Sequence, residues 1–122
     1  MRVSIVAIAM AAMSVSSMAY ADGDPVLGKS VFNKCAVCHT IDPAKKGVGP
    51  TLFGVVGRQS ATVEGYSYST AMKAANKTWD AATLDVYLTD PKAMVPGTKM
   101  TFAGLPKPED RANVIAYLAT IK

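Results

Sequence analysis

Cys35-Ala36-Val37-Cys38-His39 is the most informative stretch of this 122-residue sequence. Its C-x-x-C-H spacing is the pattern of covalent c-type haem attachment. On a helical turn, residues three and four positions apart share a face. The sulfurs of Cys35 and Cys38 can therefore reach the two vinyl groups at one porphyrin edge, while the imidazole of His39 lies under the iron. The motif predicts one covalently bound haem c with His39 as an axial ligand.

Other uses of two closely spaced cysteines explain the motif less well. A thioredoxin-like redox pair needs a βαβ context, and no segment of the chain alternates apolar and polar residues long enough to predict a strand. A structural zinc site needs four Cys or His ligands, whereas Cys35, Cys38 and His39 are the only Cys and His residues of the chain. A disulfide across two residues would be strained and would leave His39 without a role.

The N-terminal segment has the order of regions found in a secretory signal peptide. Arg2 precedes an apolar run over residues 3–13, and small residues follow up to Ala21. This run of 11 residues is short for a membrane-spanning helix, which needs about 20, so we expect no membrane anchor. We predict that residues 1–21 are a signal peptide cleaved after Ala21, and that residues 22–122 form one haem domain in the periplasm.

The predicted mature chain is small and mildly basic. Without residues 1–21 it has 101 residues, with 12 Lys and Arg against 9 Asp and Glu, a net charge of +3. A charge of this size does not by itself indicate nucleic acid binding. A domain of about 100 residues buries a modest share of its surface and often needs a further stabilising group, which agrees with a buried haem.

Apolar spacing and capping residues predict an all-α fold of short helices and long loops. A first helix begins at Asp24-Pro25, a weak second covers residues 70–75, a third follows Asp80 and the last begins at Pro108. Their apolar positions are Leu27, Val31 and Phe32 in the first, Leu84, Tyr87 and Leu88 in the third, and Val114, Tyr117, Leu118 and Ile121 in the last.

Two long stretches, residues 40–69 and 91–107, lack a periodic apolar pattern. Loops of this length in a compact domain are usually functional or pack against something else. A buried cofactor would provide the surface against which they pack.

The residues around the motif leave the sixth iron ligand open. His39 is the only histidine, so a second histidine ligand is excluded, and the sixth position is held by methionine, by a weaker donor or by nothing. Met72 lies in the weak second helix and is expected to pack in the core. Met94 and Met100 both lie in the aperiodic 91–107 segment, and spacing does not choose between them.

Much of the mature chain resembles the class I cytochromes c of the bacterial cytochrome c2 and mitochondrial type. The stretches that carry the resemblance are Gly47-Val48-Gly49-Pro50-Thr51-Leu52 with Gly57-Arg58, Gly65-Tyr66-Ser67-Tyr68-Ser69, Thr78-Trp79, Tyr87-Leu88-Thr89-Asp90-Pro91-Lys92 and Pro96-Gly97-Thr98-Lys99-Met100-Thr101-Phe102-Ala103-Gly104. The resemblance implies the small all-α cytochrome c fold wrapped around one haem. It further implies that Met100 is the sixth ligand and that the Pro50 carbonyl bonds the other ring nitrogen of His39.

The resemblance also implies surroundings for the haem. Arg58, Tyr68 and Trp79 are expected around one haem propionate. Tyr87 and Thr98 are expected near the methionine and the inner propionate. Where many relatives have an asparagine near the haem, this chain has Met72, so we expect a different buried water network.

Histidine and methionine ligation predicts a one-electron carrier and not an enzyme. Both axial positions are then filled, which leaves no place for oxygen or peroxide, and a thioether ligand favours the reduced state of the iron. One alternative is a haem enzyme or gas sensor with a sixth site that opens, but no distal acid or base accompanies the haem. Another is a cytochrome subunit held by a dehydrogenase, which would need an extensive apolar surface.

The placement of charges predicts the partners. Basic residues flank the motif and the methionine segment: Lys29, Lys34, Lys92, Lys99 and Lys107. The acidic residues Asp80, Asp85, Glu109 and Asp110 fall in helices expected on other faces. A basic ring around the haem edge would steer a monomer to acidic docking sites on membrane redox complexes. The expected donor is of the quinol–cytochrome c reductase type, and the acceptor is an oxidase, a reaction centre or a reductase.

Overall fold

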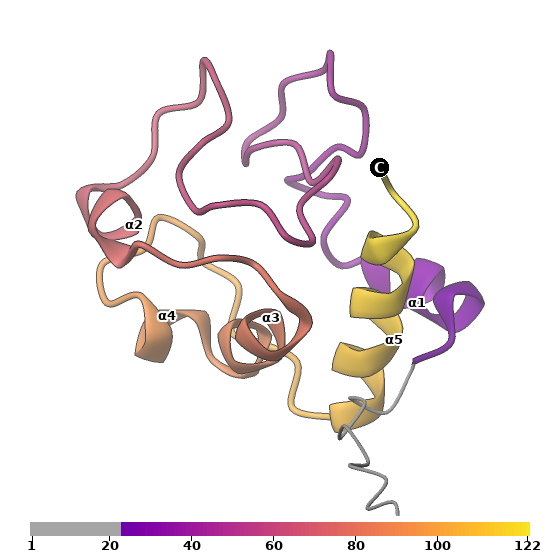
Figure 1. The fold of residues 1–122 in the computed structure, drawn as a ribbon. Helices are drawn as coiled ribbons and strands as arrows, with labels where there is room; N and C mark the ends of the chain where they lie inside the picture. Colours follow the sequence, from indigo (N-terminus) through magenta and orange to yellow (C-terminus); the bar gives the residue numbers. More distant parts are fainter. Residues whose placement is uncertain (1–22) are drawn as a thin grey trace, which may run out of the picture.

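The computed structural model describes residues 23–122, and this part of the chain contains five short α-helices (Figure 1). They are α1 (Pro25–Phe32), α2 (Thr70–Ala75), α3 (Ala81–Thr89), α4 (Pro91–Met94) and α5 (Pro108–Ala119). Within the described range, extended pairing is limited to one isolated bridge between Gln59 and Thr78. The predicted all-α fold is confirmed. The predicted signal peptide and its cleavage site lie outside the described residues.

All four predicted helices begin where the sequence predicts, including α2 over Thr70–Ala75, and the first turns of α1, α3 and α5 show why. The Asp24 carboxylate accepts a hydrogen bond of 2.8 Å from the Val26 amide, and Pro25 occupies the first helical turn of α1. Asp80 caps α3 in the same way through the Thr83 amide. These side chains satisfy amide donors that have no partner inside the helix. Helix α5 has no side-chain cap, but Glu109 and Asp110 in its first turn complement the helix dipole.

Helices α1 and α5 cross at Gly28, where a Cβ atom would overlap the backbone of Asn113. The absence of a side chain at Gly28 therefore lets the two helices approach closely. Phe32 and Tyr117 pack beside this crossing with their ring centroids 5.4 Å apart. The prediction that Leu27 belongs to the apolar side of α1 is wrong, because it is 55% exposed. The face that meets α5 is centred one residue further along, on Gly28.

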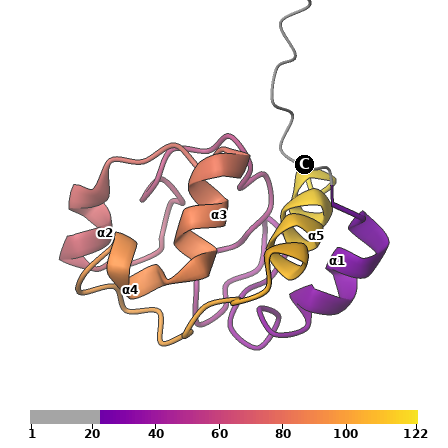
Figure 2. The same ribbon diagram turned by 90° about the horizontal axis from the view of Figure 1, so that it is seen from below.

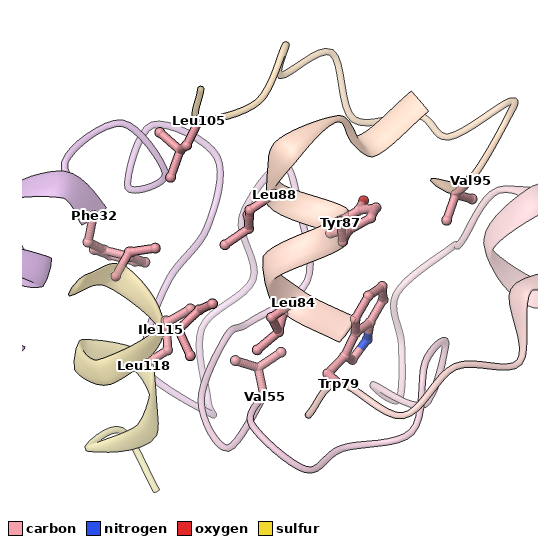
Figure 3. Packing of buried hydrophobic residues seen from close by; sticks show 11 residues of the cluster. Phe32, Val55, Trp79, Leu84, Tyr87, Leu88, Val95, Leu105, Ile115 and Leu118 are labelled. Atoms are coloured by element: carbon pink, nitrogen blue, oxygen red, sulfur yellow. The ribbon is translucent and has the colours of Figure 1, made fainter. Parts of the chain in front are cut away.

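The buried core lies between α5 and α3 and continues toward the loops (Figure 3). Leu84, Tyr87 and Leu88 of α3 are buried, as predicted. The core residues of the described range are Phe32, Val55, Trp79, Leu84, Tyr87, Leu88, Val95, Leu105, Val114, Ile115 and Leu118. Helices α2 and α4 lie at the opposite end of the molecule from the α1–α5 pair (Figures 1 and 2).

The expectation that residues 91–107 are entirely irregular is wrong at their start. Helix α4 covers Pro91–Met94, and the Asp90 carboxylate accepts from the Ala93 amide at 3.3 Å. Four residues are too few to show an apolar period in the sequence. No helix in residues 23–122 has the length and apolar character needed to cross a membrane.

Candidate functional site

The Cys35–His39 motif forms a helical turn directly after α1. The Cys35 amide bonds the Phe32 carbonyl at 2.7 Å, and the His39 amide bonds the Cys35 carbonyl at 2.9 Å. Cys35 is half-buried, Cys38 is exposed, and neither forms a disulfide within the described residues. Burial raises the pKa of the Cys35 thiol, and the nearby charge of Lys34 partly offsets this. The turn therefore presents two thiols and an imidazole at the spacing expected from the sequence.

The His39 ring is held in a defined orientation and tautomer. Its Nδ1 lies 2.7 Å from the Pro50 carbonyl oxygen. A carbonyl only accepts hydrogen bonds, so Nδ1 carries the proton and Nε2 keeps a lone pair that can bind a metal. Burial lowers the pKa of His39, which keeps the ring neutral at pH 7, although the Pro50 hydrogen bond acts in the opposite direction. A neutral, oriented imidazole is the form that ligates iron.

The peptide that contains Pro50 is bonded along its length to the motif. The Gly49 amide donates to the Cys38 carbonyl, and the Leu52 amide donates to the Thr40 carbonyl, both at 2.8 Å. A Cβ atom on Gly49 would lie 2.5 Å from Cε1 of His39, so the ring packs directly on this glycine. Two backbone bonds and one missing side chain thus fix where the imidazole lies.

Met100 lies close to His39. Its Sδ is 3.9 Å from the hydroxyl of Tyr87 on α3, and its amide bonds the Thr98 hydroxyl at 3.3 Å. Burial raises the pKa of Tyr87, and a hydrogen bond with Thr98 acts against this. Tyr87 therefore stays protonated at neutral pH and can donate to the sulfur. Near Met100, Lys99 donates to the Ser67 carbonyl at 2.9 Å.

Met94 occupies a different place from Met100, although the two residues are close in the sequence. It belongs to α4 and lines a surface groove between α3 and α4 together with Val86 and Ala93. Val86 is 55% exposed, so this groove opens to solvent. The structure thus brings Met100, and not Met94, beside Tyr87. Met72 is half-buried and packs against the core cluster, as its core-packing prediction requires.

The residues expected around a propionate are tied to the surrounding loops. Arg58 donates to the carbonyls of Phe53 and Thr51, each at 3.0 Å. Burial lowers the pKa of Arg58, and neighbouring Tyr68 opposes this. The Tyr68 hydroxyl accepts from the Val63 amide at 3.0 Å.

Trp79 connects this part of the site to the methionine side. Its amide donates to the Arg58 carbonyl at 2.8 Å, and its ring lies 4.8 Å from that of Tyr87. The structure therefore links Arg58, Trp79, Tyr87 and Met100 in one continuous chain of contacts (Figure 3 shows Trp79 and Tyr87).

Some residues that make contacts in or near the site were given no role in the sequence analysis. Tyr66 packs edge-on against Tyr68 with ring centroids 4.7 Å apart. Arg111 pairs with Asp85 across 26 positions of sequence. The alternating tyrosines at positions 66 and 68 are a sequence signal for the Tyr66–Tyr68 contact. No local sequence pattern predicts the Arg111–Asp85 pair.

The donor set fits a c-type haem. Two cysteines outside any disulfide and an imidazole share one turn, the Pro50 bond to Nδ1 leaves Nε2 as the atom of His39 that would bind a metal, and a thioether lies close to that imidazole. Together with the all-α fold, these features define a c-type cytochrome.

Comparisons with known proteins give the family. The Cytochrome c family model matches residues 25–122, and the chain belongs to this family. It is 55% identical over 116 residues to a cytochrome c2 of Rhodomicrobium vannielii, covering 94% of this chain and 93% of the relative. A cytochrome c2 of Rhodoblastus acidophilus is 54% identical over 101 residues, covering 82% and 94%.

A solved structure agrees with the fold. Cytochrome cH from Methylobacterium extorquens matches with a TM-score of 0.76 and 46% identity, covering 80% of this chain and 99% of that one. The chain is thus a cytochrome c2-like electron carrier and not an enzyme, with Cys35 and Cys38 suited to covalent haem c.

Proposed function

We propose that this protein carries single electrons between membrane-bound redox complexes through one haem c, whose iron His39 and Met100 would ligate. The observation that carries the proposal is the close approach of Met100 to His39, whose Nδ1 is committed to the Pro50 carbonyl. When bound, the haem supplies a reversible one-electron change at its iron. Cys35 and Cys38 provide the covalent attachment.

The residues of the chain determine how that change is used. With both His39 and Met100 bound, the iron would have no position left for oxygen or peroxide, which favours electron transfer over substrate chemistry. Tyr87 donates toward the methionine sulfur and orients it. Arg58, Tyr68 and Trp79 would provide donors for one propionate, and Thr98 would provide one for the other, because a buried carboxylate needs such partners.

The proposed setting is the periplasm. Residues 1–21 act as a signal peptide that is removed after Ala21, and residues 22–122 form the haem domain. The order of charged, apolar and small residues supports this proposal. A covalent attachment suits this location, because it prevents loss of the cofactor outside the cytoplasm.

The proposed partners are acidic docking sites on a quinol–cytochrome c reductase type donor and on an oxidase, reaction centre or reductase as acceptor. All five lysines of the basic set are exposed: Lys29, Lys34, Lys92, Lys99 and Lys107. Lys34 lies near enough to Cys35 to influence the pKa of its thiol. Positive charge at the attachment edge would steer the protein to acidic surfaces, and redox encounters of this kind use small, short-lived interfaces.

The ligand assignment is tested by two matched variants. Oxidised protein should show a methionine–iron absorption band. Met100→Leu should abolish this band, whereas Met94→Leu, an identical change six residues earlier in the groove beside α3, should leave it intact. Loss of the band in the Met94 variant alone would refute the assignment.

The partner assignment is tested by the salt dependence of reduction by a quinol–cytochrome c reductase. The rate should fall steeply as ionic strength rises past about 0.1 M, where screening acts within about 10 Å. Lys34→Glu should slow the reaction at low salt much more than Lys122→Glu, which makes the same charge change at the C-terminus. Equal effects of the two variants would show that net charge, and not its placement, controls the encounter.

A further inference from the structure

Arg111 of α5 bonds both to the segment just before its own helix and to Asp85 of α3, which lies 26 positions earlier. Its Nε is 2.8 Å from Oδ1 of Asp85 on α3. Its Nη1 donates to the carbonyls of Leu105 at 2.7 Å and Pro106 at 3.1 Å. The Arg111 and Asp85 side chains are 11% and 23% exposed, so solvent screens this pair only partly. One guanidinium therefore joins α5, α3 and the end of the segment that carries Met100.

The segment from Val95 to Leu105, here called the methionine loop, is anchored at both ends. Val95 is 2% exposed and Leu105 is 1% exposed. The Leu105 amide donates to the Leu88 carbonyl at 2.7 Å. Figure 3 shows Leu105 and Val95 on opposite sides of Tyr87 and Leu88. The methionine loop thus runs past α3 between two buried ends, and Arg111 adds hydrogen bonds at the C-terminal end of the loop.

Helix α3 holds both the contact to Met100 and the anchor of the loop. Tyr87, whose hydroxyl lies 3.9 Å from the methionine sulfur, directly precedes Leu88 and lies two residues after Asp85. Arg111 bonds Asp85 on this helix and, at the same time, the carbonyls of Leu105 and Pro106 at the end of the methionine loop. A guanidinium is planar and presents its donors in a fixed arrangement. It therefore sets the position of the loop end relative to the helix that contacts the ligand.

We propose that Arg111 is a positioning residue for the Met100 ligand, acting with Asp85 through the end of the methionine loop. This inference rests on the proposed ligation by Met100. Without Arg111, the carbonyls of Leu105 and Pro106 lose a charged donor, and the loop end is held to α3 mainly by the Leu88 bond. The sulfur then competes less well for its position against an added ligand.

The test is competition by imidazole in the oxidised, haem-bearing protein, followed through loss of the methionine–iron band. Arg111→Gln should lower the imidazole dissociation constant about tenfold, since charge-assisted hydrogen bonds are lost. Arg111→Lys keeps the charge but not the planar set of donors, and should behave nearly like Arg111→Gln. Asp85→Asn leaves the bonds to the loop carbonyls in place and should change the constant by about threefold or less.

Asn113→Ala on the same helix is the matched control. Asn113 accepts from the Asp24 amide at 2.8 Å and packs against Gly28, so its contacts are with α1 and not with the methionine loop. This variant should lower stability to denaturant while leaving the imidazole constant unchanged. The proposal is overturned if Arg111→Gln shifts the imidazole dissociation constant no more than Asn113→Ala does. If Arg111→Gln does not fold, the same comparison is made with Arg111→Lys. Two other results would instead overturn the proposed ligation by Met100. One is the absence of the methionine–iron band in the wild type, and the other is its persistence in Met100→Leu.

Discussion

The His39 side and the Met100 side of the site are held by different kinds of contact. On the His39 side, the imidazole lies between its own helical turn and the peptide of Gly49 and Pro50, which bonds back to that turn. The partners are at most about a dozen residues apart. On the Met100 side, the contacts come from three separate elements: Tyr87 lies on α3, Ser67 is 32 positions from Lys99, and Arg111 of α5 is paired with Asp85 26 positions away.

This difference indicates which of the two proposed ligands, His39 or Met100, is more easily displaced. The His39 position depends on local bonds that form together with the motif turn. The Met100 position depends on the packing of α3, α5 and residues 61–69. A change that weakens the packing of these elements therefore also displaces Met100. We expect disturbances of the tertiary structure to weaken the methionine ligand first. Three substitutions test this comparison.

Gly104→Ala should have the largest effect, because it disturbs the end of the methionine loop. Gly104 has φ +112, and a Cβ atom there would overlap the Thr89 carbonyl. Backbone strain and overpacking together should lower the free energy of unfolding by about 3 kcal/mol. Denaturant titration measures this loss, and the methionine–iron band should weaken with it.

Gly54→Ala is the control for backbone strain alone. Gly54 has φ +67, but no atom lies within 4 Å of an added Cβ. It should cost about 1 kcal/mol and leave the band intact. If both glycine variants lose the same stability, the Thr89 contact does not constrain the loop.

Gly49→Ala tests the opposite side of the comparison, with an intermediate effect. The new methyl group would press on the His39 ring, which cannot retreat without losing its bond to Pro50. We expect a loss of about 2 kcal/mol in unfolding free energy, with the methionine band retained. Val48→Ala, at the exposed neighbouring position, should be nearly neutral. If Gly49→Ala folds normally but loses the methionine–iron band, the His39 side and the Met100 side of the site are coupled.

Tyr87→Phe should have the smallest effect at neutral pH, about 1 kcal/mol, because one hydrogen bond to the sulfur is lost. Burial raises the pKa of Tyr87 above its ordinary value of 10.0. The stability that the protonated hydroxyl contributes is therefore complete below pH 10 and is lost as pH rises through the folded-state pKa.

The wild type should consequently lose stability above pH 10 more steeply than Tyr87→Phe. Denaturant titrations of both proteins across this range measure the difference. Tyr117→Phe, beside the α1–α5 crossing, is the control and should not alter the methionine band. Parallel pH profiles for wild type and Tyr87→Phe would contradict the argument.

Features that depend on a few adjacent residues could be predicted from the sequence. The motif turn, the caps at Asp24 and Asp80 and the start of α5 at Pro108 are all confirmed. Each depends on bonds between residues a few positions apart, so the pattern of side chains carries the information. Helix α4 was missed because four residues show no period, and Leu27 was misassigned because the crossing uses Gly28, which no apolar pattern marks.

Spacing alone left Met94 and Met100 equivalent, and the family resemblance was needed to choose Met100. The tertiary structure separates them, since α4 carries Met94 to the groove beside α3 while the methionine loop brings Met100 to Tyr87. The Arg111–Asp85 pair is likewise invisible in the sequence, because its partners are 26 positions apart. The residues by themselves determined the attachment turn and the first ligand, whose bonds are local. Only the folded chain shows where Met100 and its supporting contacts lie, because these depend on where separate helices pack.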